Sequence, residues 1–227
     1  MATSRATRAR IKPAVLALPS ASTESRRIDM RLVSNEGHYR EVVQRGLVTA
    51  RASIWISTAN IKDVHIEAPI GTRARARGRF VSLFEWLKSQ FDAGLDVRLL
   101  HAAPPSRVLA TKPAWHQSAA MRRACPRVHL KMLAIDGRLL YLGSANLTGA
   151  GVGAKSHNGR NFEAGILTDD PWLLDELQGT FDAIWSGKHC RNCRVRSRCA
   201  LPLDTISVGT PNLSRERVIR KTHAKSK

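Results

Sequence analysis

The run from His129 to Asn146 constrains the fold of this chain more than any other feature. It overlaps two apolar segments that favour β-strands, 127–135 and 139–142, with the pair Asp136-Gly137 between them. Glycine supplies the positive φ that a tight turn between antiparallel strands requires. The run therefore predicts a β-hairpin, and each of its polar residues has a fixed place relative to the two strands.

The polar residues of this predicted hairpin suit the binding of a phosphoryl group. Residues two apart in a strand point to the same face, so His129 and Lys131 are expected to lie side by side. Gly143 has no side chain, which would let a phosphate approach the backbone. Ser144 and Asn146 follow it with hydroxyl and amide donors. Together these residues predict a phosphate cradle built without a metal ion.

The spacing of these residues resembles, in full, the HKD motif of the phospholipase D superfamily. The positions that carry the resemblance are His129, Lys131, Asp136, Gly143, Ser144 and Asn146. Glu163, in the sequence Asn-Phe-Glu, resembles the downstream carboxylate position of that family. The order of expected helices and strands extends the resemblance more weakly over residues 36–185.

The resemblance implies a mechanism that needs no cofactor. His129 would attack phosphorus and form a phosphohistidine, while a second histidine would protonate the leaving oxygen and then activate water. Glu163 would hold an imidazole in one tautomer. Lys131 and Asn146 would stabilise the charge on the phosphoryl oxygens. Asp136, at the turn, is expected in a structural or outer position.

The mechanism needs two histidines, yet the chain supplies one motif. His129 begins the only His-x-Lys that is followed by Gly-Ser-x-Asn, and His65 has Glu67 where the lysine would stand. A twofold dimer would bring both copies of His129 to one phosphate. The sequence therefore predicts a homodimer with one shared active site.

Apolar periodicity on both sides of the hairpin predicts helices alternating with strands. Helical spacing spans 36–51, 80–91, 115–123 and 171–185, and strand patterns span 53–57, 96–100 and 161–168. The expected fold is an α/β, phospholipase D-like layered fold, in which helices flank a central mixed β-sheet. Three segments are expected: a basic flexible arm (1–28), a catalytic domain (29–187), and a basic Cys-containing appendage with a tail (188–227).

The charge of the chain indicates a polyanionic partner. The sequence has 37 Lys and Arg residues against 18 Asp and Glu, which gives a formal charge of +19. Anionic lipid would also be attracted, but nucleic acid is favoured. No base-reading element is recognisable, so little sequence preference is expected. The arginines expected to contact nucleic acid are Arg73, Arg75, Arg77, Arg79, Arg191, Arg194, Arg196 and Arg198.

The cysteines suggest a metal centre. Cys190, Cys193 and Cys199 lie within ten residues, and Cys125 or His189 would complete a set of four ligands. Zinc is the simplest expectation, and an iron–sulfur cluster is the less favoured alternative. Three free thiols on a basic surface loop are the alternative without metal.

A single motif, high positive charge and no transmembrane segment resemble the homodimeric, metal-independent nucleases of the superfamily. The size and the cysteine-bearing C-terminal region also resemble the phospholipase D-like component of DISARM anti-phage systems. That resemblance implies a cytoplasmic endonuclease with other subunits of a defence complex as partners. Three alternatives stay open: a lipid phosphodiesterase, a hydrolase of cyclic nucleotides or oligonucleotides, and a nucleic-acid-binding clamp with little activity of its own.

Overall fold

The computed structural model describes residues 27–68 and 71–206. Of the expected basic arm, only residues 27 and 28 fall within this part, and the expected tail beyond residue 206 lies outside it. The hairpin, the strand that follows it and the cysteine-rich segment are all described.

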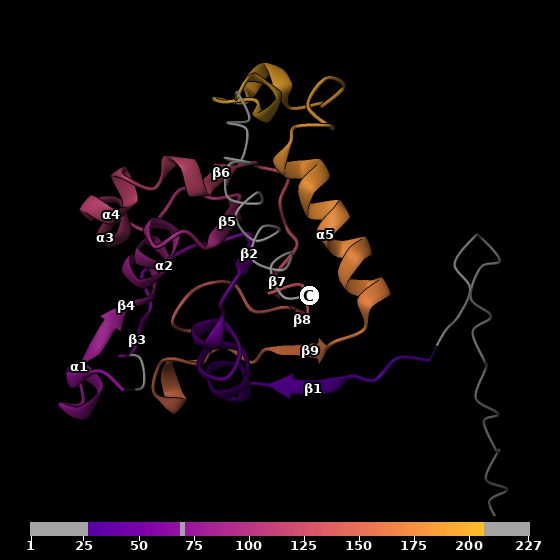
Figure 1. Cartoon of the computed structure of the whole chain (residues 1–227). Coiled ribbons are helices and arrows are strands. Elements are labelled where there is room, and N and C mark those ends of the chain that lie inside the picture. The colour runs from indigo at the N-terminus through magenta and orange to yellow at the C-terminus, as the bar shows by residue number, and fades with distance from the viewer. Residues whose placement is uncertain (1–26, 69–70, 207–227) are drawn as a thin grey trace, which may run out of the picture.

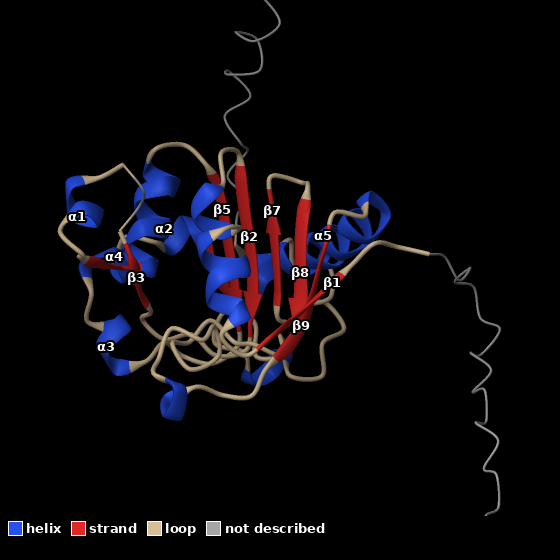
Figure 2. Ribbon diagram, turned by 90° about the horizontal axis from the view of Figure 1, so that it is seen from below, coloured by secondary structure: helices blue, strands red, loops and turns tan. Residues whose placement is uncertain are grey.

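A seven-stranded mixed sheet forms the centre of the molecule (Figure 2). In spatial order its strands are β1 (Arg31–Ser34), β9 (Ala164–Thr168), β8 (Leu139–Gly143), β7 (Met132–Ile135), β2 (Ser53–Thr58), β5 (Asp96–His101) and β6 (Arg122–Ala124). The neighbours β2, β5 and β6 run parallel, and the other pairs are antiparallel. The predicted α/β fold with a central mixed sheet is confirmed.

Helices and short turns connect these strands, and a small sheet stands apart from them. The α-helices are α1 (Arg73–Ala76), α2 (Leu83–Asp92), α3 (Arg107–Ala110), α4 (Pro113–His116) and α5 (Pro171–Trp185). The other helical segments are η1 (His38–Gln44), η2 (Leu47–Thr49), η3 (Ala119–Met121), η4 (His157–Gly159), η5 (Arg196–Arg198) and η6 (Leu203–Thr205). The small sheet pairs β3 (His65–Glu67) with β4 (Phe80–Ser82).

Both faces of the central sheet are covered, and its strand β7 is apolar and buried along its whole length. Figure 1 shows α5 on one side of the sheet and α2 on the other. On β7, Leu133 and Ile135 pack into the core beneath η1 and α2, whereas Met132 and Ala134 pack into the core beneath α5. This alternation on a strand buried on both faces explains why the sequence reads as a continuous apolar run.

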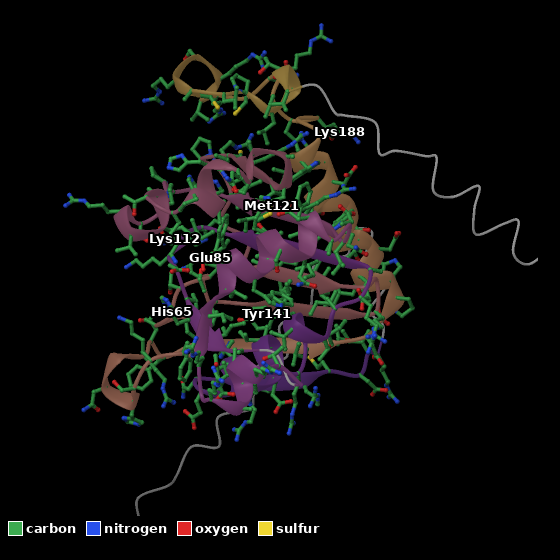
Figure 3. The ribbon with its side chains drawn as sticks, turned by 60° about the vertical axis from the view of Figure 1, so that its left-hand side comes forward. His65, Glu85, Lys112, Met121, Tyr141 and Lys188 are labelled. Atoms are coloured by element: carbon green, nitrogen blue, oxygen red, sulfur yellow. The ribbon has the colours of Figure 1, made fainter. Side chains whose placement is uncertain are left out.

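Polar contacts also join the peripheral helices. Lys112, just before α4, bonds Glu85 of α2 at 2.8 Å and Asp63 at 3.1 Å, and Figure 3 shows Lys112 beside Glu85. The α2 helix begins at Leu83 rather than at 80, because Ser82 ends β4 and its hydroxyl accepts from the Glu85 N–H. The expected helix start was therefore wrong by the length of β4.

Two further boundaries differ from the sequence expectation. The single helix expected over 36–51 is divided into η1 and η2 at Gly46, where a side chain would lie 2.6 Å from the Val42 carbonyl oxygen. The helix expected over 115–123 is replaced by α4, the single turn η3 and strand β6. Here pairing of β6 with β5 overrides the local helical spacing.

The predicted hairpin is present with a shorter first strand. Asp136 and Gly137 have φ angles of 54° and 62°, so both adopt the left-handed conformation that the turn requires. Regular pairing in β7 begins only at Met132, and β9 begins at Ala164 rather than at 161. The Gly143 N–H nevertheless donates to the Lys131 carbonyl at 3.2 Å, which carries the ladder up to the motif lysine.

Candidate active site

His129 and Lys131 lie side by side immediately before β7. The Lys131 ammonium lies 3.2 Å from Nδ1 and 3.1 Å from Nε2 of His129, and it donates to the His129 carbonyl oxygen at 2.9 Å. His129 is exposed, whereas Lys131 is 9% exposed. The buried lysine is thus held in place while the imidazole remains open to a substrate or to a second protein chain.

Glu163 lies between two donors at the start of β9. Ser144, which follows β8, donates a short hydrogen bond to one carboxylate oxygen, and Asn161 Nδ2 donates to the other at 3.0 Å. The Ser144 hydroxyl in turn accepts from the Ala164 N–H at 3.1 Å. Within the described residues no hydrogen bond joins Glu163 to His129, and the role of Glu163 in holding an imidazole in one tautomer stays a prediction.

Asn146 is oriented by the carboxyl end of β2. Its Oδ1 accepts from the backbone N–H groups of Ala59 at 3.1 Å and Asn60 at 3.0 Å, and the Thr58 hydroxyl lies at 3.4 Å. Two N–H donors on one side of the amide require the oxygen to face them. The NH₂ group is therefore turned away from β2, where it can donate to a phosphoryl oxygen.

Gly143 is required by strand packing. A Cβ at this position would collide with the Tyr141 hydroxyl and would lie 2.7 Å from the Gly165 Cα of the neighbouring strand. The approach of a phosphate to this glycine stays a prediction, and the packing of β8 against β9 is a separate reason for it.

Tyr141 contacts the backbone of the cradle at Ala145, and it was not predicted from the sequence. Its hydroxyl accepts from the Ala145 N–H at 3.4 Å, and its ring packs edge-on against the buried His38. Burial raises the pKa of Tyr141 to about 12, and the nearby Glu163 charge adds to the rise. Its position two residues before Gly143, on the same face of β8, is the signal that could have identified it.

Asp136 lies at the other end of β7, away from His129. Its carboxylate accepts from the backbone N–H groups of Arg51, Ala52 and Ser53 at 2.8 to 3.1 Å. Burial alone would raise the pKa of Asp136, but these N–H donors and the Arg138 charge together lower it. Asp136 thus joins the hairpin turn to the start of β2 and does not line the cradle.

Replacing Asp136 by alanine is expected to lower the free energy of unfolding at pH 7 by about 1–3 kcal/mol, because three backbone N–H groups lose a charged acceptor. A carboxylate with a lowered folded pKa stabilises the native state above its unfolded pKa, and this contribution is lost as pH falls through the folded pKa. The difference in the free energy of unfolding between wild type and the variant should therefore become smaller below about pH 4. Urea denaturation at several pH values measures it. Asp169→Ala, at an exposed residue, is the control, and equal stability of Asp136→Ala and wild type at pH 7 would contradict this role.

The two expected arginine groups lie in different parts of the molecule. The first belongs to α1 and its flanks beside the small β3–β4 sheet, and the second lies in the appendage beyond α5 (Figure 1). Two of the arginines already pair with acids, Arg75 with Glu67 and Arg196 with Asp204. The two arginine groups are therefore separate surfaces, and the ion pairs of Arg75 and Arg196 do not join either group to the cradle.

The four cysteines meet on the side of the sheet where the appendage lies. Cys125, Cys190, Cys193 and Cys199 line one small pocket, and His189 lines the neighbouring one together with Cys125. Within residues 27–68 and 71–206, no three His, Cys, Asp or Glu side chains are placed to hold a single metal ion. The expected zinc geometry is therefore not shown.

A family model described as "Cardiolipin synthase, PLD-like domain" matches residues 44–185, which include every cradle residue. The chain belongs to the phospholipase D-like family. It is accordingly a phosphodiesterase of that superfamily, as the HKD motif led us to expect. Searching the curated proteins produced no match, and none of the described helices is long and apolar enough to cross a bilayer.

Several solved structures are similar to the chain. The phospholipase D family member Nuc from Salmonella typhimurium is 16% identical, with 70% of this chain and 95% of that chain covered and a TM-score of 0.45. NucT from Helicobacter pylori is 15% identical, with 68% and 94% covered and a TM-score of 0.40. TrmBL2, an archaeal chromatin protein whose structure shows a mode of DNA binding, is 15% identical, with 69% and 52% covered and a TM-score of 0.43.

Proposed function

We propose that this protein is a metal-independent endonuclease that cuts DNA or RNA through a phosphohistidine intermediate. The observation that carries the proposal is the exposed imidazole of His129 beside the buried Lys131 ammonium, in a chain with a formal charge of +19. The ammonium and the oriented Asn146 amide supply the stabilisation of phosphoryl charge that metal ions provide in other phosphodiesterases.

The reaction proceeds in two displacements. The lone pair of a His129 ring nitrogen attacks phosphorus, so that a P–N bond forms and the P–O bond to the leaving nucleoside breaks. A second imidazole gives its proton to the leaving oxygen. Water then attacks phosphorus, its proton passes to the second imidazole, and the P–N bond breaks to release the phosphomonoester and free His129.

We infer that the second imidazole is His129 of another copy of the chain. Among the described histidines, His38 and His101 are buried in the core, at 1% and 3% exposure, and no histidine other than His129 contacts Lys131. Next to Glu163, the apolar residue Phe162 is 96% exposed, and a partner chain at this place would cover it. A twofold contact at this place would put both copies of His129 at one phosphate.

Two substrate classes have support of different kinds. The charge of the chain favours a nucleic acid, since each phosphate contact with Lys or Arg releases counterions. The description of the matching family model names cardiolipin synthase, so a lipid phosphodiester is the second candidate. We further propose a cytoplasmic role in anti-phage defence within a complex of several subunits, which the resemblance to the DISARM component supports.

A substrate panel in the presence of EDTA tests this proposal. Single-stranded and double-stranded DNA, RNA, and vesicles containing phosphatidylcholine and cardiolipin are incubated with the same preparation. We expect cleavage of at least one nucleic acid and no cleavage of lipid. The logarithm of the binding constant for nucleic acid should fall linearly with the logarithm of the salt concentration. Release of lipid headgroup without cleavage of nucleic acid would select the second candidate, and nucleic-acid binding with no cleavage would indicate a clamp.

A further inference from the structure

All of the chain's cysteines meet at one place. The sequence contains four, and all four line one pocket between the central sheet and the appendage. Cys125 follows β6, whereas Cys190, Cys193 and Cys199 come from the appendage after α5. Figure 3 labels Lys188 at the start of this appendage. Tertiary folding therefore joins one distant cysteine to the three that are close in sequence.

Hydrogen-bond donors lie beside two of these sulfur atoms. Backbone N–H groups of Arg127 and Val195 donate to the sulfurs of Cys125 and Cys193, and the Arg127 guanidinium lies 3.6 Å from the Cys193 sulfur. The rest of the pocket is largely apolar, and the residues that make it so are Ala124, Pro126, Val195, Pro202 and Leu203.

A zinc ion and an iron–sulfur cluster require different spacings of their cysteine sulfurs. A single zinc ion needs all its thiolates at about 2.3 Å from one point. No three metal-ligating side chains within the described residues meet that requirement, although the four cysteines surround one pocket. In a four-iron cluster each thiolate binds a different iron atom, so the sulfurs stand further apart.

We propose that Cys125, Cys190, Cys193 and Cys199 bind an iron–sulfur cluster of the [4Fe–4S] class. The cluster holds the appendage against the catalytic layer, where η5 and η6 are single turns and Leu203 is the one residue of residues 200–206 that is buried in the core. Metal–thiolate bonds stabilise small segments of this kind, which bury too little apolar surface to fold by themselves. Because Cys125 lies four residues before His129, the cluster also fixes one end of the catalytic segment.

Metal analysis of the full chain tests the proposal directly. The protein is purified without oxygen, and its iron, acid-labile sulfide and zinc are measured together with its visible absorption spectrum. We expect about four iron and four sulfide per chain, with the broad visible absorption of a cluster. Four titratable free thiols without iron would overturn the proposal, and stoichiometric zinc without iron would overturn it in favour of a single-ion site.

Matched variants assign the ligands. Cys193→Ser and Cys125→Ser should each lose most of the iron and visible absorption, whereas Ser197→Ala, at an exposed position between two of the cysteines, should retain both. Loss in Cys193→Ser together with full retention in Cys125→Ser would contradict the long-range ligand. If a serine variant does not fold, the iron and sulfide content of the wild-type protein still decides the proposal.

Discussion

Replacing His129 by alanine should lower the rate of phosphodiester cleavage by roughly 10⁴-fold or more, because no other described residue beside Lys131 offers a nucleophilic nitrogen. Nucleic-acid affinity should change by no more than about threefold, since the positive charge of the chain is retained. Single-turnover cleavage of the best substrate from the panel, with EDTA present, measures the first quantity. A filter-binding or anisotropy titration measures the second.

The matched control is His116→Ala. His116 is an exposed histidine at the end of α4, so the substitution makes the same change outside the cradle and should leave cleavage unaltered. A His129→Ala protein that still cuts at the wild-type rate would exclude His129 as the nucleophile. Equal losses in both variants would point to a fault in folding rather than in chemistry, and thermal unfolding of the two proteins distinguishes these cases.

A mixed dimer containing one wild-type chain and one His129→Asn chain should retain less than about 5% of the wild-type rate. Each phosphate requires two imidazoles, one as nucleophile and one as acid and base, and the mixed dimer has only one of them. Two affinity tags, one on each chain, allow the mixed species to be isolated after co-expression. Its cleavage rate is then compared with that of a doubly tagged wild-type dimer.

The alternative outcomes of this experiment are distinct. Half of the wild-type rate would mean that each chain carries a complete site, which contradicts the shared centre. A chain that sediments as a monomer at all concentrations would contradict it as well. A mixed dimer of wild-type and His116→Ala chains should be fully active, and this result shows that the tags and the exchange procedure do not themselves impair the enzyme.

The sequence by itself determined the hairpin and the side-by-side placement of His129 and Lys131. Both depend on local rules: strand alternation, the left-handed turn at Asp136-Gly137 and spacing within one short segment. The mixed sheet also followed from alternating helical and strand patterns. Gly46 shows where such rules stop, because its φ and ψ of −94° and −84° are not helical and divide a segment whose apolar spacing was continuous.

Only the tertiary structure decided how the cradle residues are held. The orientation of Asn146 depends on backbone donors of Ala59 and Asn60, and the position of Asp136 depends on N–H groups of 51–53. Cys125 likewise reaches its three partners only through the packing of the appendage. These contacts join segments more than sixty residues apart, and no periodicity in the sequence encodes which distant backbone group a side chain will meet. The residue types of the site can therefore be recognised within one short segment of the sequence. Their geometry depends on how the sheet brings distant segments together.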